Sequence, residues 1–154
     1  MDEQFLQSIR SQCAVVRASC ANAHLRSATR AVTQLYAKFL APSGLEPTQF
    51  TLLVACAVAG DVPISILANR LVMDRTTLAR NLKPLEGKGL VEVATGEDRR
   101  ERMVSINEKG YSTLAVAYPL WQEAQKQIVD GFGRKRLDDL LQDLSAITEL
   151  VQEA

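Results

Sequence analysis

A helix predicted near the middle of the chain carries side chains that can contact DNA bases and phosphates. It begins at Arg75, and Leu78, Leu82 and Leu85 recur on one face at steps of four and three residues. Its other face carries the basic, amide and hydroxyl side chains Arg75, Thr76, Thr77, Arg80, Asn81 and Lys83. Arginine can donate two hydrogen bonds to guanine, asparagine can pair with adenine, threonine methyl groups contact thymine, and lysine holds phosphates. The pattern predicts a helix that enters the major groove, which is about 12 Å wide.

A second cluster of arginines follows at the tip of a predicted β-hairpin. Val91 and Val93 alternate with other residues, and so do Val104 and Ile106 after the polar stretch 95–102. A period of two is typical of strands, so the polar stretch forms the tip of a hairpin. The charged candidates for DNA contact around this tip are Asp98, Arg99, Arg100 and Arg102. Arginine fits the narrow, negative minor groove of A·T-rich DNA, so the tip predicts a second DNA contact.

The residues before these clusters predict the compact unit that positions them. Residues 62–64 suffice only for a bridge strand, Ser65 can cap a helix over 66–72, and Asp74 can cap the helix that begins next. Pro84 lacks an amide hydrogen, so we expect a bend there. This order of elements is that of a winged helix-turn-helix. A winged-helix module that binds proteins instead of DNA would not need basic groups on both the helix and the hairpin.

Further helices are predicted on both sides of this unit. Residues 1–40 read as one long helix with an apolar seam over 25–39. Thr48 can cap a buried helix over 49–59, and Gly60 is its expected end.

The residues after Gly110 return to the helical period. Apolar residues recur over 114–128, and Pro119 should kink that helix or mark its restart. A final helix carries an apolar seam over 137–150. The N-terminal and final seams lie outside the central unit, so they need partners within the chain or across a two-fold dimer.

The composition argues against several classes of protein. The chain of 154 residues has the size of one domain, and its 18 basic and 18 acidic side chains cancel, so any basic surface is local. No apolar stretch is long enough for a membrane span and no signal peptide is recognised, so we expect a cytoplasmic protein without a membrane partner. One histidine, His24, and the lack of catalytic or phosphate-binding motifs predict no enzyme, no cofactor and no metal site.

From Leu25 to about Ile128 the chain resembles the MarR family of dimeric bacterial transcription regulators. Residues 98–104, Asp-Arg-Arg-Glu-Arg-Met-Val, fit the wing pattern D-x-R-x-x-x-V of the family, and Gly110 follows at the expected place. Residues 73–82 are similar to the recognition helix of one branch of the family, and the stretch 119–121, Pro-Leu-Trp, is similar to that branch too. Residues 106–107, Ile-Asn, replace the Leu-Thr of the family, a departure that should leave the strand intact.

The resemblance implies a mainly α fold with a small β-hairpin, in which a winged helix-turn-helix is flanked by dimerisation helices. It implies an N-terminal dimerisation helix (1–45), a DNA-binding region (46–110) and C-terminal dimerisation helices (111–154). Each protomer of a homodimer would present one winged helix to half of an inverted-repeat operator in double-stranded DNA. Arg100 would enter the minor groove, and Asp98 would orient it. The expected function is a repressor that an unknown small-molecule effector releases from DNA.

The cysteines leave a redox-sensing repressor open as the alternative. The chain has an odd number of cysteines, which does not favour a disulfide scaffold; they are Cys13, Cys20 and Cys56. On one intact helix Cys13 and Cys20 would lie about 10 Å apart along the axis, too far for a disulfide within the chain. Cys56 lies in an almost wholly apolar helix, which predicts a buried, unreactive thiol. Some MarR relatives sense oxidants through a cysteine near the first helix, so Cys13 and Cys20 are the redox candidates. Cys13 is favoured because Arg10 and Arg17 are close in the sequence.

Overall fold

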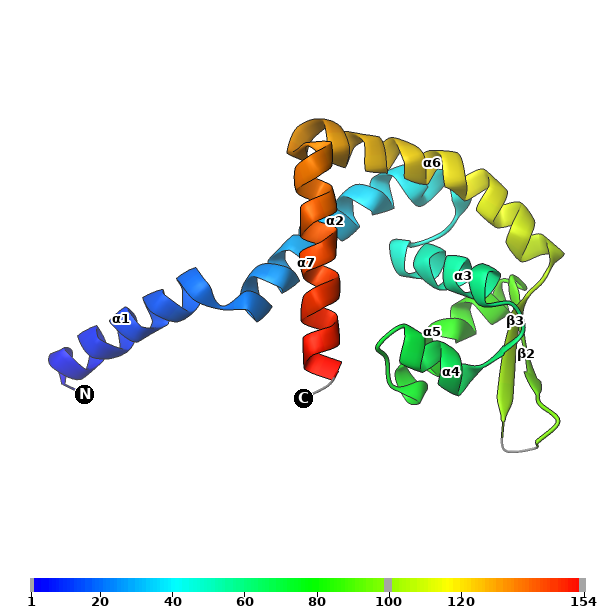
Figure 1. The fold of residues 1–154 in the computed structure, drawn as a ribbon, viewed down its shortest axis with the longest axis horizontal. Helices are drawn as coiled ribbons and strands as arrows, with labels where there is room; N and C mark the ends of the chain where they lie inside the picture. Colours follow the sequence, from blue (N-terminus) through cyan, green and yellow to red (C-terminus); the bar gives the residue numbers. More distant parts are fainter. Residues whose placement is uncertain (1, 99–100, 153–154) are drawn as a thin grey trace. The chain divides into compact units, whose positions relative to one another are not determined.

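Helices make up most of the structure, and one small antiparallel sheet completes it (Figure 1). The computed structural model describes residues 2–98 and 101–152. In chain order the elements of this described part are α1 (Glu3–Ser19), α2 (Ala21–Leu40), η1 (Ala41–Ser43), α3 (Pro47–Ala59), β1 (Val62–Pro63), α4 (Ile64–Arg70), α5 (Arg75–Gly87), β2 (Val91–Thr95), β3 (Arg102–Ile106), α6 (Glu108–Phe132) and α7 (Arg134–Gln152). The predicted fold class, mainly α with a winged helix-turn-helix, is confirmed.

The chain forms two compact units, Met1–Leu35 and Tyr36–Ala154, and α2 passes from the first into the second. The expected single helix over residues 1–40 is wrong, because α1 ends at Cys20, whose backbone is extended at φ −72° and ψ 107°. The apolar positions of α1, such as Ile9 and Val16, are out of phase with the seam that begins at Leu25. This change of phase is the signal that the prediction overlooked. Since Cys20 is the cap residue of α1, Cys13 and Cys20 do not share one intact helix.

Two other helices begin at residues other than the predicted caps. Helix α3 begins after Glu46 rather than at Thr48, because Glu46 and Gln49 form a capping box and a proline occupies the first turn. Helix α4 follows Pro63 directly, so Ser65 lies inside the helix and is not its cap. The predicted cap Asp74 and the predicted end at Gly60 are confirmed.

The core lies in the second unit, between the sheet and helices α3 to α6. The strand order is β1-β3-β2, and both neighbours of β3 are antiparallel to it. Val104 pairs with Val62 on one side and with Val93 on the other, and its side chain is fully buried. The short strand β1 therefore joins the predicted hairpin to the helices before it.

Two long helices follow the sheet. Helix α6 continues through Pro119 without a restart and ends at Gly133, which has a φ of 94°. Its first turn approaches the sheet closely, because a Cβ atom on Gly110 would lie 2.3 Å from the carbonyl oxygen of Leu90. Among the described residues of α7, Leu137 alone is buried. No described helix meets the length and apolarity that crossing a bilayer requires.

Candidate nucleic-acid interface

The cap and the apolar face of α5 fix the orientation of this helix. A carboxylate oxygen of Asp74 accepts a hydrogen bond from the backbone amide of Thr77 at 2.8 Å. Hydrogen bonds from the side chain and the backbone of Thr77 hold the pKa of Asp74 below its ordinary value. On the inner face Leu78, Leu82 and Leu85 are at most 1% exposed, as predicted. The opposite face of α5 must therefore point away from the core.

The predicted DNA-contact residues of α5 lie together on this outer face. Arg75, Thr76, Arg80 and Lys83 are exposed, whereas Thr77 and Asn81 are half-buried. The ion pairs among the described residues are Lys126–Asp130 and Lys135–Asp139, so no carboxylate neutralises the basic groups of α5. The structure thus brings to one helical surface an amide and three cationic groups that form no ion pair with a described residue. Their contacts with DNA bases and phosphates stay a prediction.

The far end of α5 is held by two lysine side chains. The Nζ atom of Lys88 donates to the carbonyl oxygen of Gly44 at 2.7 Å and to Oε1 of Gln49 at 2.8 Å. Lys109 Nζ donates to the carbonyl oxygen of Lys88 at 2.6 Å. Cations at this end complement the helix dipole, so both lysines serve the fold of the winged helix rather than its outer surface.

The turn between α4 and α5 contains a strained backbone. The amide of Met73 donates to the carbonyl oxygen of Ala68 at 2.9 Å, and the amide of Val72 donates to the carbonyl oxygen of Asn69 at 3.2 Å. These two bonds define a Schellman motif with Val72 in the left-handed region at a φ of 54°. Glycine usually occupies this position, because a side chain there meets the backbone. Sequence reasoning missed the strain, since no glycine marks the turn.

The hairpin places the described part of the wing beside the sheet. Thr95 pairs with Arg102, and the amide of Gly96 donates to the carbonyl oxygen of Glu101 at 2.9 Å. Asp98 and Arg102 are exposed. The other two predicted wing residues, Arg99 and Arg100, lie outside the described residues. The orientation of Arg100 by Asp98 therefore stays a prediction.

The thiols differ in their surroundings. Cys13 is exposed, Cys20 is half-buried and Cys56 is fully buried. Burial raises the pKa of the Cys56 thiol from 9.0 to about 11, so the predicted unreactive thiol is consistent with the structure. Among the described residues, no group of histidine, cysteine and carboxylate side chains could hold a metal ion.

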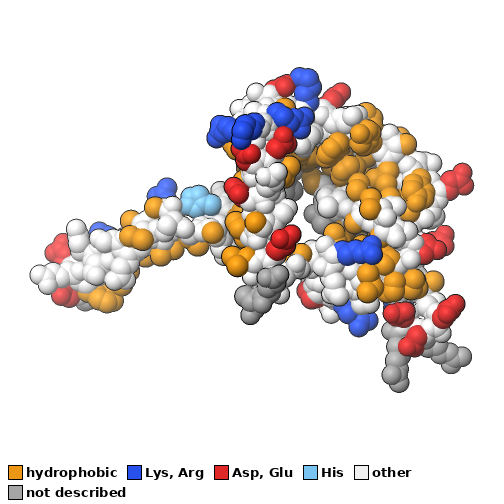
Figure 2. All heavy atoms as spheres, in the orientation of Figure 1, with side chains coloured by type: hydrophobic (Ala, Val, Ile, Leu, Met, Phe, Trp, Pro, Cys, Tyr) orange, Lys and Arg blue, Asp and Glu red, His pale blue; other side chains and the backbone are white. Residues whose placement is uncertain are grey.

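Sequence reasoning also missed an aromatic hollow between α3 and α6. Phe50, Thr51, Val54, Tyr118 and Trp121 line a space of about 300 Å³. The ring centroids of Phe50 and Trp121 are 6.5 Å apart, and those of Tyr118 and Trp121 are 5.7 Å apart. Hydrophobic side chains gather on the surface in this region (Figure 2). The signal in the sequence is the spacing of three between Tyr118 and Trp121 on one helix, but Phe50 comes from a distant segment.

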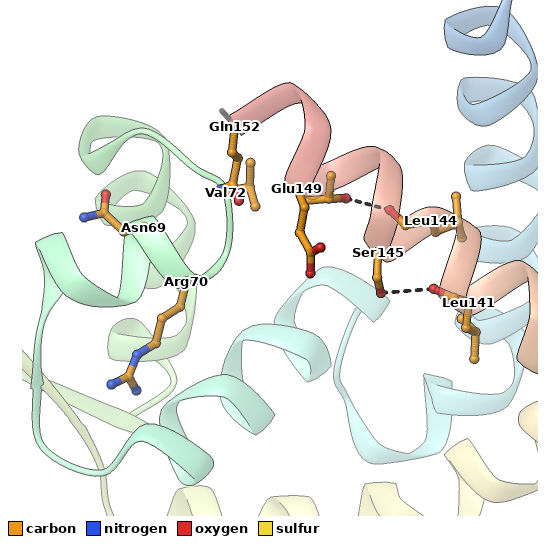
Figure 3. A pocket seen from close by; sticks show the side chains of 9 residues that line it. Asn69, Arg70, Val72, Leu141, Leu144, Ser145, Glu149 and Gln152 are labelled. Carbon is orange, nitrogen blue, oxygen red and sulfur yellow. Dashed lines mark hydrogen bonds between the residues drawn. The ribbon is translucent and has the colours of Figure 1, made fainter. Parts of the chain in front are cut away.

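A second, more polar hollow lies between the end of α4 and α7 (Figure 3). Asn69, Arg70 and Val72 line one side, and residues of α7 that include Leu141 and Glu149 line the other. The hydroxyl groups of α7 in this hollow donate to carbonyl oxygens of their own helix, at 3.0 Å from Ser145 and 2.8 Å from Thr148. These two hydroxyl groups are therefore engaged within α7.

Comparisons with known proteins agree with this geometry. A model described as MarR family matches residues 43–101. The transcriptional regulator MosR from M. tuberculosis, solved in complex with DNA, is 34% identical with a TM-score of 0.76, over 86% of this chain and 98% of that chain. The transcriptional repressor CouR, solved bound to a 23-mer DNA duplex, is 27% identical with a TM-score of 0.77, over 86% and 95% of the two chains.

More distant structures share the fold. A mutant of MarR from E. coli, solved with operator DNA, is 19% identical with a TM-score of 0.76, over 86% of this chain and 96% of that chain. A search of curated proteins gave no match. The family model covers the winged helix from α3 to β2 and ends before β3, and the likeness to MosR extends over most of the chain. The chain belongs to the MarR family of DNA-binding transcriptional regulators.

Proposed function

We propose that this protein is a homodimeric repressor that binds an inverted-repeat operator in double-stranded DNA. The observation that carries the proposal is the outer face of α5, where Arg75, Arg80 and Lys83 are exposed without ion pairs in the described structure. Exposed cations without ion pairs can neutralise phosphates, so such a surface suits an anionic partner such as DNA. The relatives solved with DNA support the same reading, and CouR is itself described as a repressor.

The outer helices support a two-fold dimer. Val32 in α2 and Leu141 and Leu150 in α7 are exposed although they belong to apolar seams. A second copy would remove these side chains from water, so residues 1–45 and 111–154 would supply the interface and residues 46–110 the DNA contacts. Two symmetry-related α5 helices should prefer half-site centres about 10 base pairs apart, which is one turn of DNA.

An effector would act by favouring one dimer geometry. The hollow at Phe50, Tyr118 and Trp121 has an almost wholly apolar lining, which suits a flat apolar or aromatic molecule. It lies between α3 of the winged helix and α6, so a ligand there would contact both elements. A ligand that binds one dimer geometry more tightly than the other would shift the spacing of the α5 helices and release DNA. The exposure of Cys13 supports a thiol switch as the alternative route to release.

The test is a gel shift on the promoter region of the protein itself, at fixed salt concentration. Wild type should give a discrete shifted band, and Arg80→Ala should weaken it. Lys135→Ala is the control for the loss of one positive charge, because Lys135 is a basic residue of α7, outside the proposed DNA-binding region 46–110. A wild-type protein that shifts no DNA would leave a winged-helix protein-interaction module as the better reading. An Arg80→Ala variant that binds like wild type would remove Arg80 from the DNA contact.

A further inference from the structure

Helix α1 carries an apolar stripe that lies open to solvent. Leu6, Ile9, Cys13 and Val16 follow steps of three, four and three residues, and Phe5 lies beside them. This spacing is that of a coiled-coil seam. No described residue of α1 is buried, and Phe5 and Val16 are 55% and 60% exposed. A 17-residue helix with such a stripe is marginal alone in water, so it needs a partner.

The edge of this stripe is basic. Arg10 and Arg17 come directly after the stripe residues Ile9 and Val16, so both arginines flank the stripe on the same side. From Phe5 to Ser19 there is no carboxylate, and within the described residues neither arginine forms an ion pair. Two α1 helices that paired in antiparallel fashion would bring these like charges together. The charges favour a partner with an acidic edge.

Helix α7 begins with three basic residues, 134–136, and the rest of the helix has the complementary, acidic character. The stretch 137–152 carries four carboxylates and no lysine or arginine. Of these carboxylates Asp139 pairs with Lys135, whereas Asp138, Asp143 and Glu149 form no ion pair among the described residues. The apolar side chains that α7 exposes are Leu140, Leu141, Ile147, Leu150 and Val151. At helical spacing Asp143 is a neighbour of Leu140 and Ile147, and Asp138 is a neighbour of Leu141, so carboxylates border the exposed apolar surface.

We propose that α1 packs along α7 of a second copy of this chain, with Arg10 and Arg17 beside the carboxylates of that helix. The inference rests on the proposed homodimer and deepens it by naming the segments that meet. Two-fold symmetry repeats the contact, so each dimer gains two apolar seams and two sets of opposite charges. Residues 1–20 lie outside the segment 43–101 that the family model matches, so this match says nothing of the partner of α1.

The first experiment exchanges the charges and measures the dimer dissociation constant by analytical ultracentrifugation. Arg10→Glu with Arg17→Glu should raise the dissociation constant about tenfold or more. Asp138→Lys with Asp143→Lys and Glu149→Lys should do the same, and the combined variant should regain most of the loss. The matched control is Gln7→Glu with Ser11→Glu, which adds negative charge to the opposite face of α1 and should leave the constant unchanged.

The second experiment locates the contact by cross-linking. In a Cys20→Ser background, Leu144→Cys places a thiol on the apolar side of α7, and oxidation should join it to Cys13 of the second copy. A non-reducing gel should then show a band of twice the chain mass, whereas Gln142→Cys on the other side of α7 should give little of it.

Several results would overturn the contact. A cross-linked band at the mass of one chain would place α1 on its own α7, and a tighter dimer for Arg10→Glu with Arg17→Glu would indicate pairing of two α1 helices. An unchanged dissociation constant with intact operator binding would remove the α1–α7 contact and leave the homodimer standing. A wild-type monomer at every concentration would remove both proposals.

Discussion

The strained residue Val72 yields a prediction in which the usual ranking of alanine and glycine reverses. Two Schellman motifs end the two helices of the helix-turn-helix, one with Val72 and one with Gly89 in the left-handed region, at φ 54° and φ 67°. At such a position a residue with a Cβ atom costs about 1–2 kcal/mol, whereas the greater freedom of glycine in the unfolded chain costs about 0.5–1 kcal/mol. Val72→Gly should therefore be more stable than Val72→Ala by about 0.5–1 kcal/mol.

Two other positions, Gly89 and Ala79, serve as the reference and the control for the variants at residue 72. Gly89→Ala should destabilise the protein by a similar amount, because a Cβ atom there would lie 3.8 Å from Lys109 Nζ, an ordinary contact that adds no clash. The exposed helical residue Ala79 is the control, and Ala79→Gly should cost about 1 kcal/mol. Comparison of Val72→Gly with Val72→Ala cancels the loss of the valine side chain, which is 56% exposed.

The assay is urea unfolding followed by circular dichroism, at one fixed protein concentration because a dimer unfolds in a concentration-dependent way. The decisive quantity is the sign of the difference in unfolding free energy between the two variants at residue 72. If Val72→Ala is the more stable variant, residue 72 does not have a left-handed backbone and the reasoning about the turn is wrong.

Four further predictions concern DNA, packing and the thiols. Arg80→Ala and Asn81→Ala should each weaken operator binding by about 1–3 kcal/mol in titrated gel shifts, whereas Lys83→Ala should weaken operator and random DNA alike; equal affinities for all variants would remove α5 from recognition. Arg100→Ala should lower affinity most for operators with A·T-rich flanks, and Asp98→Ala should do so less; footprints that ignore both changes would refute the wing contact. Gly110→Ala should destabilise the protein by about 1–3 kcal/mol, because its Cβ atom would lie 2.3 Å from a backbone oxygen. Gly131→Ala in the same helix would meet no atom within 4 Å and should stabilise the protein, so thermal melts of the two variants should shift in opposite directions. At pH 8 to 9 iodoacetamide should label Cys13 and spare Cys56 in the folded protein, because the pKa of Cys56 is raised to about 11. The contribution of this neutral thiol to the free energy of unfolding should be lost as the pH rises from about 9 through 11. Rapid labelling of Cys56, read by mass spectrometry, would contradict its burial.

The parts of the site that the sequence predicted correctly depend on neighbours along the chain. Asp74 caps α5 because its carboxylate reaches an amide three residues later, and Leu78, Leu82 and Leu85 share a face through the helical repeat alone. The hairpin follows from a period of two and from a polar tip. Such signals predict which side chains share the outer face of α5, and the structure confirms that placement.

The predictions were wrong where two local signals compete along the chain. Thr48 is an acceptable cap, but Glu46 with Gln49 forms a reciprocal pair of bonds that a single threonine cannot match. The break at Cys20 is indicated by the apolar residues before and after it, which would lie on different faces of one continuous helix. The spacing of apolar residues within either segment alone does not show this break.

The sequence by itself determined most of the helices, the hairpin and the outer face of α5, because each is set by residues a few positions apart. Only the tertiary structure decided that Phe50 meets Trp121 in an aromatic hollow, and that Val72 adopts a strained backbone in a turn without glycine. The physical reason is that the buried leucines of α4 and α5, on either side of the turn, pack into the core and hold that turn in place. A buried core can therefore impose a local conformation that the residues of the turn would not choose alone.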